Sequence, residues 1–188
     1  ALTVNQIKGV SANFIKGLAS DDVAKLSDVA VAAIAPKSLT TMTNFAGLTS
    51  DNLGLISSAQ VNALTAAQVQ TMSGSDNDIQ YLTPAALAGL DKKNIASVNL
   101  SKLTVDQFTA LTADQLNAIA AVNAATGITG TGFSAITSEE IAALTPKQAA
   151  GLSTAFTAAL NTDHVSKLTA EAVATLSPKA FAAITTDL

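Results

Sequence analysis

Residues 168–184 read LTAEAVATLSPKAFAAI, and this stretch contains the feature on which the fold depends, an eight-residue pattern that is repeated directly after itself. LTAEAVAT (168–175) is followed by LSPKAFAA (176–183), and a new Ile begins at 184. Eighteen full octads of this kind can be laid along the 188 residues. They fall into five blocks, 2–47, 48–81, 82–102, 103–135 and 136–188, and the register slips at Met42, Met72, Val98 and Ile119. A period this short is the first property to explain, because internal repeats determine the architecture.

Position 2 of the octad carries the residue types that begin helices. It is Ser, Thr, Asp or Asn in every octad except those with Ala19 and Ala35. These side chains accept a hydrogen bond from a free N–H in the first helical turn. Position 5 is Gln in six octads, which completes the reciprocal pair known as a capping box. The four prolines all fall at position 3, the first helical residue, where proline costs no hydrogen bond: Pro36, Pro84, Pro146 and Pro178. Each octad therefore predicts a helix that starts near position 2, where its cap lies.

Positions 1 and 6 supply the apolar face of these helices. Position 1 is always a large aliphatic residue, and position 6 is large and apolar in sixteen of the eighteen octads. Position 8 is often Gly or Ala, which lets neighbouring backbones approach closely. Helices shorter than about 12 residues are marginal in water by themselves, so stability has to come from stacking. The pattern predicts an all-α solenoid of short N-capped helices, each about five to eight residues long. A bundle in which some octads fuse into longer helices is the alternative.

A β-structure is disfavoured, because strict apolar–polar alternation is absent and alanine is depleted in strands. The exception to the helical pattern is NAATGITGTGFSA (123–135), where Gly127, Gly130 and Gly132 interrupt it. We expect an irregular loop or a short hairpin there. The blocks predict one repeat domain over 1–188, cut from a longer chain.

Composition excludes several classes of function. The chain has no cysteine, so thiolate metal sites and cysteine nucleophiles are excluded. Every basic residue is lysine and the net charge is −4, which makes nucleic acid an unsuitable partner. No apolar run approaches the roughly 20 residues of a transmembrane helix, so no membrane span is expected.

Few residues suggest chemistry. Asp76 and Asp78 lie in SGSDNDIQY (73–81), a cluster of oxygen ligands that suits Ca²⁺ although EF-hand spacing is missing. His164, the only histidine, takes the position that is Gln elsewhere, and we expect it to cap its own helix through Asn161. Glu139 and Glu140 lie in the first turn of a predicted helix, where acids favour the helix dipole. GITGTG (127–132) lacks the preceding strand and the lysine of a phosphate-binding loop. No catalytic constellation is present, so no enzyme activity and no cofactor are expected.

Three stretches are close to the form L-[TS]-x-x-Q-[VI]-x-A: ISSAQVNALTAAQVQTM (56–72), LTVDQFTALTADQLNAI (103–119) and ITSEEIAALTPKQAAGL (136–152). This pattern resembles repeat arrays of large secreted bacterial surface proteins described as hemagglutinin-like or adhesin-like. The resemblance implies a stalk, spacer or scaffold at the bacterial cell surface, with other segments of the same large protein as its partners. The alternative function is a binding module for a host or surface glycan or protein, or a Ca²⁺-stabilised one.

Overall fold

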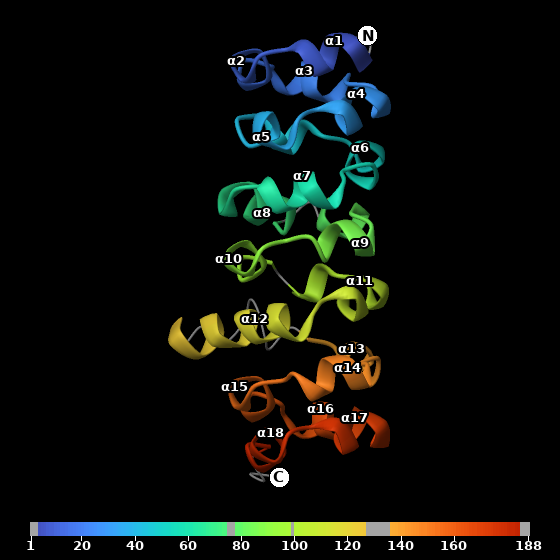
Figure 1. Ribbon diagram of the computed structural model, residues 1–188, viewed down its shortest axis with the longest axis vertical. Helices are drawn as coiled ribbons and strands as arrows, with labels where there is room; N and C mark the ends of the chain where they lie inside the picture. The colour runs from blue at the N-terminus through green and yellow to red at the C-terminus, as the bar shows by residue number, and fades with distance from the viewer. Residues whose placement is uncertain (1–3, 75–77, 99, 127–135, 185–188) are drawn as a thin grey trace. The chain divides into compact units, whose positions relative to one another are not determined.

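The computed structural model describes residues 4–74, 78–98, 100–126 and 136–184. Within these ranges the secondary structure is helical throughout, with no strand. The chain divides into two compact units, Ala1–Asn94 and Ile95–Leu188. In each unit short helices follow one another and stack in layers (Figure 1). The predicted all-α, solenoid-like stack of short helices is therefore confirmed.

The first unit is built from ten α-helices and two 3₁₀ helices among its described residues. In chain order they are α1 (Val4–Gly9), α2 (Ala12–Lys16), α3 (Ser20–Ala24), α4 (Asp28–Ala33), α5 (Pro36–Leu39), η1 (Phe45–Gly47), α6 (Ser50–Gly54), α7 (Ser58–Ala63), α8 (Ala66–Met72), η2 (Asp78–Tyr81), α9 (Pro84–Leu87) and α10 (Lys92–Ile95), whose last residue belongs to the second unit.

The second unit continues in the same way. Its described elements are η3 (Leu100–Lys102), α11 (Val105–Ala110), α12 (Ala113–Thr126), α13 (Ser138–Ala142), α14 (Pro146–Ala150), α15 (Thr154–Ala158), α16 (Thr162–Lys167), α17 (Ala170–Thr175) and α18 (Pro178–Ala182).

The helices begin where the caps predict. At α7 the Ser57 side chain accepts from the Gln60 N–H, and the Gln60 side chain accepts from the Ser57 N–H. The same reciprocal box begins α6, α8, α11, α13, α14 and α16. All four prolines occupy the first helical residue, in α5, α9, α14 and α18. Local cap chemistry thus fixes the start of these helices, whereas α3 begins after Ala19 with no side-chain cap.

The register slips coincide with changes in helix type. The slips at Met42, Met72 and Val98 are followed by the 3₁₀ helices η1, η2 and η3. These segments are six, ten and five residues long instead of eight, and a 3₁₀ turn fits such irregular lengths better than another α-turn. The slip at Ile119 has a different result, because α12 runs straight through it.

Helix α12 corrects two expectations. It has 14 residues, well beyond the predicted helix length, and it includes 123–126, which were expected to belong to a loop. Ile119 is followed by Ala120 rather than by a capping residue, and the next residues include strong helix formers, so nothing ends the helix there. Residues 127–135 of the expected loop lie outside the described residues.

Three successive elements make one coil of the stack. In the first unit α1 packs on α4, α2 on α5, α5 on α7 and α7 on α9, and each pair is three elements apart in the chain. In the second unit α13 packs on α16, α14 on α17 and α15 on α18, again three elements apart. The extended α12 contacts both α14 and α15, because it has the length of two octads. Each coil is thus a closed layer that rests on the layer before it.

The core lies between successive coils. Position 6 is fully buried in most octads, as with Ile15, Val61 and Phe108 at 0% exposure. Gly89, at position 8, shows why small residues recur there, because a Cβ on it would lie 2.8 Å from the Ser58 carbonyl oxygen and Cβ in the coil before. Close backbone approach between coils is therefore the role of this glycine.

Candidate functional site

The polar chemistry of the chain is concentrated at the corners, the junctions where one helix ends at position 1 and the next begins at position 2. Gln60 shows the arrangement most completely. Its Oε1 accepts from the Ser57 N–H at 2.9 Å, and its Nε2 donates to the carbonyl oxygens of Val31 and Ile34, both at 2.9 Å. The side chain is 1% exposed. One amide therefore caps its own helix and also joins its corner to the corner one coil earlier.

Other position-5 side chains make the same connection to the previous coil. Gln68 donates to the carbonyls of Leu39 and Met42, and Gln148 donates to those of Phe108 and Leu111. Shorter amides also reach the preceding corner, with Asn52 on Leu26 and Asn94 on Leu64. We call this set of position-5 contacts the corner ladder.

The corner ladder keeps its geometry although the chain length between its partners varies. The position-5 residue and its position-1 acceptor are 28 residues apart for His164 and Ile136, across three full octads. The separation is 26 where the short segment 42–47 intervenes, as for Gln60, and 30 where the long segment 72–81 does, as for Asn94. It reaches 37 for Gln148, across residues 119–135. Irregular lengths are therefore absorbed between corners.

His164 belongs to the corner ladder as well. Asn161 caps α16 by accepting from the His164 N–H at 2.8 Å, as expected from the sequence. The His164 Nδ1 accepts from the Asn161 N–H, so its Nε2 carries the proton and donates to the Ile136 carbonyl at 3.0 Å. The ring is 5% exposed, and both nitrogens are engaged.

Glu140 is the irregular member of the corner ladder. Its Oε2 accepts from the Thr137 N–H at 2.7 Å and from the Thr137 hydroxyl at 3.1 Å, as Gln does elsewhere. Its Oε1 occupies the place of the donating amide nitrogen, is buried and has no hydrogen-bond partner. Burial raises the pKa of this carboxyl above its ordinary value of 4.5, and repulsion from Glu139 adds to the effect, while the bonds from Thr137 oppose it.

The candidate calcium ligands are not placed by the structure. Asp76 lies outside the described residues, and so does the side chain of Asp78, whose backbone begins η2. The glycine-rich GITGTG (127–132) also lies outside them. Among the side chains that are described, no three of His, Asp and Glu come together in a way that would hold a metal ion.

Two surface grooves occupy equivalent places in the two units. One of about 350 Å³ lies at the Met42 corner in the first unit, and one of about 340 Å³ lies at the Leu111 corner in the second. Both are lined by threonines: Thr40, Thr41, Thr43, Thr65 and Thr71 in the first, and Thr109, Thr112 and Thr145 in the second. Each of these hydroxyls donates to a backbone carbonyl or to the position-5 Gln of its own octad. The threonine hydroxyls that line the two grooves therefore already donate hydrogen bonds to groups of the protein itself.

A third hollow, of about 670 Å³, lies on the first coil. Its lining includes Phe14 and Asp22, which are exposed position-5 residues, together with the half-buried Leu18 and Leu26. Position 5 faces the preceding coil elsewhere in the stack, so this hollow is the open face of the first described coil.

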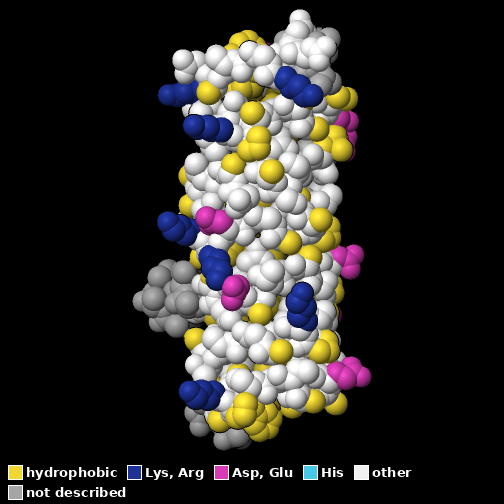
Figure 2. Space-filling model, viewed as in Figure 1, with side chains coloured by type: hydrophobic (Ala, Val, Ile, Leu, Met, Phe, Trp, Pro, Cys, Tyr) yellow, Lys and Arg dark blue, Asp and Glu magenta, His cyan; other side chains and the backbone are white. Residues whose placement is uncertain are grey.

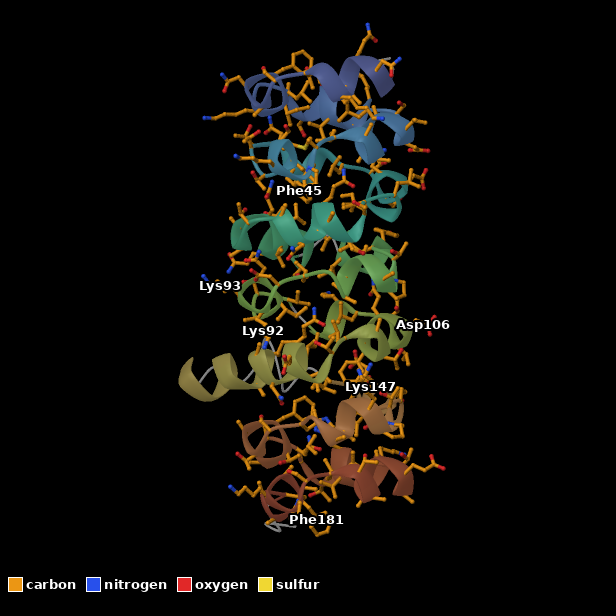
Figure 3. The ribbon with its side chains drawn as sticks, in the orientation of Figure 1. Phe45, Lys92, Lys93, Asp106, Lys147 and Phe181 are labelled. Atoms are coloured by element: carbon orange, nitrogen blue, oxygen red, sulfur yellow. The ribbon has the colours of Figure 1, made fainter. Side chains whose placement is uncertain are left out.

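On the face drawn in Figure 2, charged side chains do not gather into one patch. Figure 2 shows lysines and acidic residues interspersed and set apart on the face in view. Lys92 and Lys93 on α10, Asp106 on α11 and Lys147 on α14 are the charged side chains labelled in Figure 3. None of the described helices is both long and apolar enough to cross a membrane.

The corner ladder was not predicted, although the sequence contains a signal for it. Read locally, position 5 indicates only the second half of a capping box, a role that Glu fills as well as Gln. Six octads nevertheless carry Gln and one carries Glu. That preference indicates a need for an N–H donor, which the carbonyls of the preceding corner explain.

Comparisons of this chain with protein-family models, with curated proteins and with solved structures found no match.

Proposed function

We propose that this chain is a non-enzymatic structural repeat region, a stalk, spacer or scaffold, of a secreted bacterial surface protein with a role in adhesion. The observation that carries the proposal is the engagement of the polar side chains. The buried amides of Gln60, Gln68 and Gln148, and both ring nitrogens of His164, join helix starts to the preceding coil. These buried polar groups therefore hold successive coils together, which is what a structural repeat region requires.

The surface hollows support the same proposal. A groove that recognises a sugar or a peptide needs donors and acceptors that are not already paired. The threonine protons in the grooves at Met42 and Leu111 are donated within the protein. The sequence resemblance to arrays of hemagglutinin-like and adhesin-like proteins agrees with a role as the support for another, adhesive segment.

The proposal is tested on cells of the source organism with an antibody against this chain. We expect the antibody to label intact cells, and we expect protease added outside the cells to remove the label. Labelling that appears only after lysis would overturn the surface assignment.

The structural part of the proposal is tested separately on the purified chain. A glycan array should give no saturable signal, and melts with Ca²⁺ and with chelator should coincide. A glycan signal would favour a binding module instead. A large Ca²⁺-dependent shift that Asp76→Ala abolishes would identify a calcium-stabilised stalk.

A further inference from the structure

Glu140 replaces an amide donor with a carboxyl group at a place where a donor is needed. In the next octad Gln148 donates from Nε2 to the carbonyls of Phe108 and Leu111, which are 40 and 37 residues earlier. The same separations from Glu140 lead to Leu100 and Leu103. These two residues form an equivalent corner, because the Leu103 N–H donates to the Leu100 carbonyl at 3.0 Å as the Leu111 N–H does to that of Phe108 at 3.1 Å.

The repeat register therefore directs Glu140 Oε1 toward two carbonyl oxygens. An ionised carboxylate only accepts hydrogen bonds, so it would oppose these carbonyls. A protonated carboxyl has one O–H to donate and would reproduce the bond that Gln148 makes. The buried Oε1, which has no partner as an acceptor, is the atom that would carry this proton.

We propose that Glu140 is a proton-dependent latch between coils, protonated in the closed stack and donating from Oε1 to the carbonyls of Leu100 and Leu103. Loss of this proton leaves a buried negative charge against the carbonyls and loosens the contact of α13 with the preceding coil. This inference concerns the stability of the stack and does not depend on the proposed cellular function.

The charged groups on the elements around Glu140 do not supply an ion pair for it. Helix α13 packs against α16 and α11. The ionisable residues of the surrounding elements are Asp163, His164 and Lys167 on α16, Asp106 on α11, Lys102 at the end of η3 beside the two proposed acceptors, and Glu139 on α13 itself. Of these, Glu139 acts on Glu140 electrostatically, and it disfavours the ionised form. His164 uses its Nε2 proton on the Ile136 carbonyl.

The direction of the pH effect follows from linkage. A carboxyl whose pKa is raised on folding stabilises the folded state fully below its unfolded value of 4.5, and this stabilisation is lost as the pH rises through the folded pKa. Between these two pKa values the unfolding equilibrium constant should rise about tenfold per pH unit relative to a chain with no titrating group there.

The test compares urea unfolding of the wild type, Glu140→Gln, Glu139→Gln and Gln148→Glu from pH 4.5 to pH 8. Glu140→Gln should remove the pH-dependent component and make the chain more stable than the wild type at pH 8. Glu139→Gln removes a neighbouring exposed charge and should keep most of that component. Gln148→Glu should introduce a second component of the same sign.

The titration of the Glu140 carboxyl, followed by ¹³C NMR in the folded wild type, gives an independent readout. A midpoint above 4.5 supports the latch. A midpoint at or below 4.5, or a Glu140→Gln chain with the wild-type pH dependence, would overturn it. Failure of Gln148→Glu to fold at pH 8 together with folding at pH 4.5 would support it.

Discussion

Replacement of Gln60 by leucine tests whether the corner ladder holds the stack together. Leucine fills a similar volume but removes every polar contact of the side chain. The Ser57 N–H loses its acceptor, and the carbonyl of Ile34 loses its donor, while the Val31 carbonyl keeps the Ile34 N–H at 3.2 Å. Each buried group left unpaired costs about 1–3 kcal/mol.

Two such groups, with a small gain from burying leucine, give an expected loss of about 2–4 kcal/mol in the free energy of unfolding. For a chain of this length that corresponds to a fall in Tm of roughly 5–15 °C. The matched control is Gln70→Leu on α8, an exposed glutamine whose replacement should change stability by less than about 0.5 kcal/mol. Urea unfolding and thermal melts followed by circular dichroism measure both variants. Equal stability of the two would show that the contact between corners contributes nothing.

Three further predictions concern packing and capping. Gly89→Ala should destabilise the chain by at least about 1 kcal/mol, because its Cβ would meet Ser58, whereas Gly9→Ala has open space and should be neutral or stabilising; melting temperatures in the opposite order would contradict this. His164→Gln should preserve stability or raise it by up to about 1 kcal/mol, since Gln makes both bonds of this position in other octads; a large loss in chemical denaturation would refute the shared role. Ile15→Asp should prevent folding and Phe181→Asp should be tolerated, because these two position-6 residues are 0% and 56% exposed; far-UV spectra that show the reverse would disprove the assigned burial.

The local features of the fold could be predicted because they depend on neighbours in the sequence. Thr65 and Gln68 lie three residues apart, so their reciprocal cap follows from the sequence alone. Proline fixes a helix start by its own covalent geometry, as at Pro84. Stacking was predictable as well, because a helix as short as α9 cannot persist without neighbours.

The arrangement in three elements per coil could not be obtained in this way. It depends on contacts between residues such as Gln60 and Ile34, which are 26 positions apart and are not linked by any local pattern. The Oε1 of Gln60 has a local partner, the Ser57 N–H, whereas its Nε2 has a distant one, the Ile34 carbonyl. The sequence pattern indicates only the local partner. The continuation of α12 through Ile119 has a different cause. The octad register slips at Ile119, but Ala120 after it provides no cap, so no new helix begins there and α12 continues.

The constancy of the corner ladder has a consequence for how such chains tolerate insertions and deletions. Segments of six, ten and seventeen residues replace an octad at 42–47, 72–81 and 119–135. The side-chain amides of Gln60, Asn94 and Gln148, which follow these segments, still bind the carbonyls of the preceding corner. A foreign peptide placed within one of these segments should therefore be carried as a graft, without a shift in the pairing downstream. The same peptide placed between Thr145 and Gln148 would separate a cap from its partner. The spacing between a cap and its position-5 partner is therefore fixed, whereas the chain length between successive corners can vary.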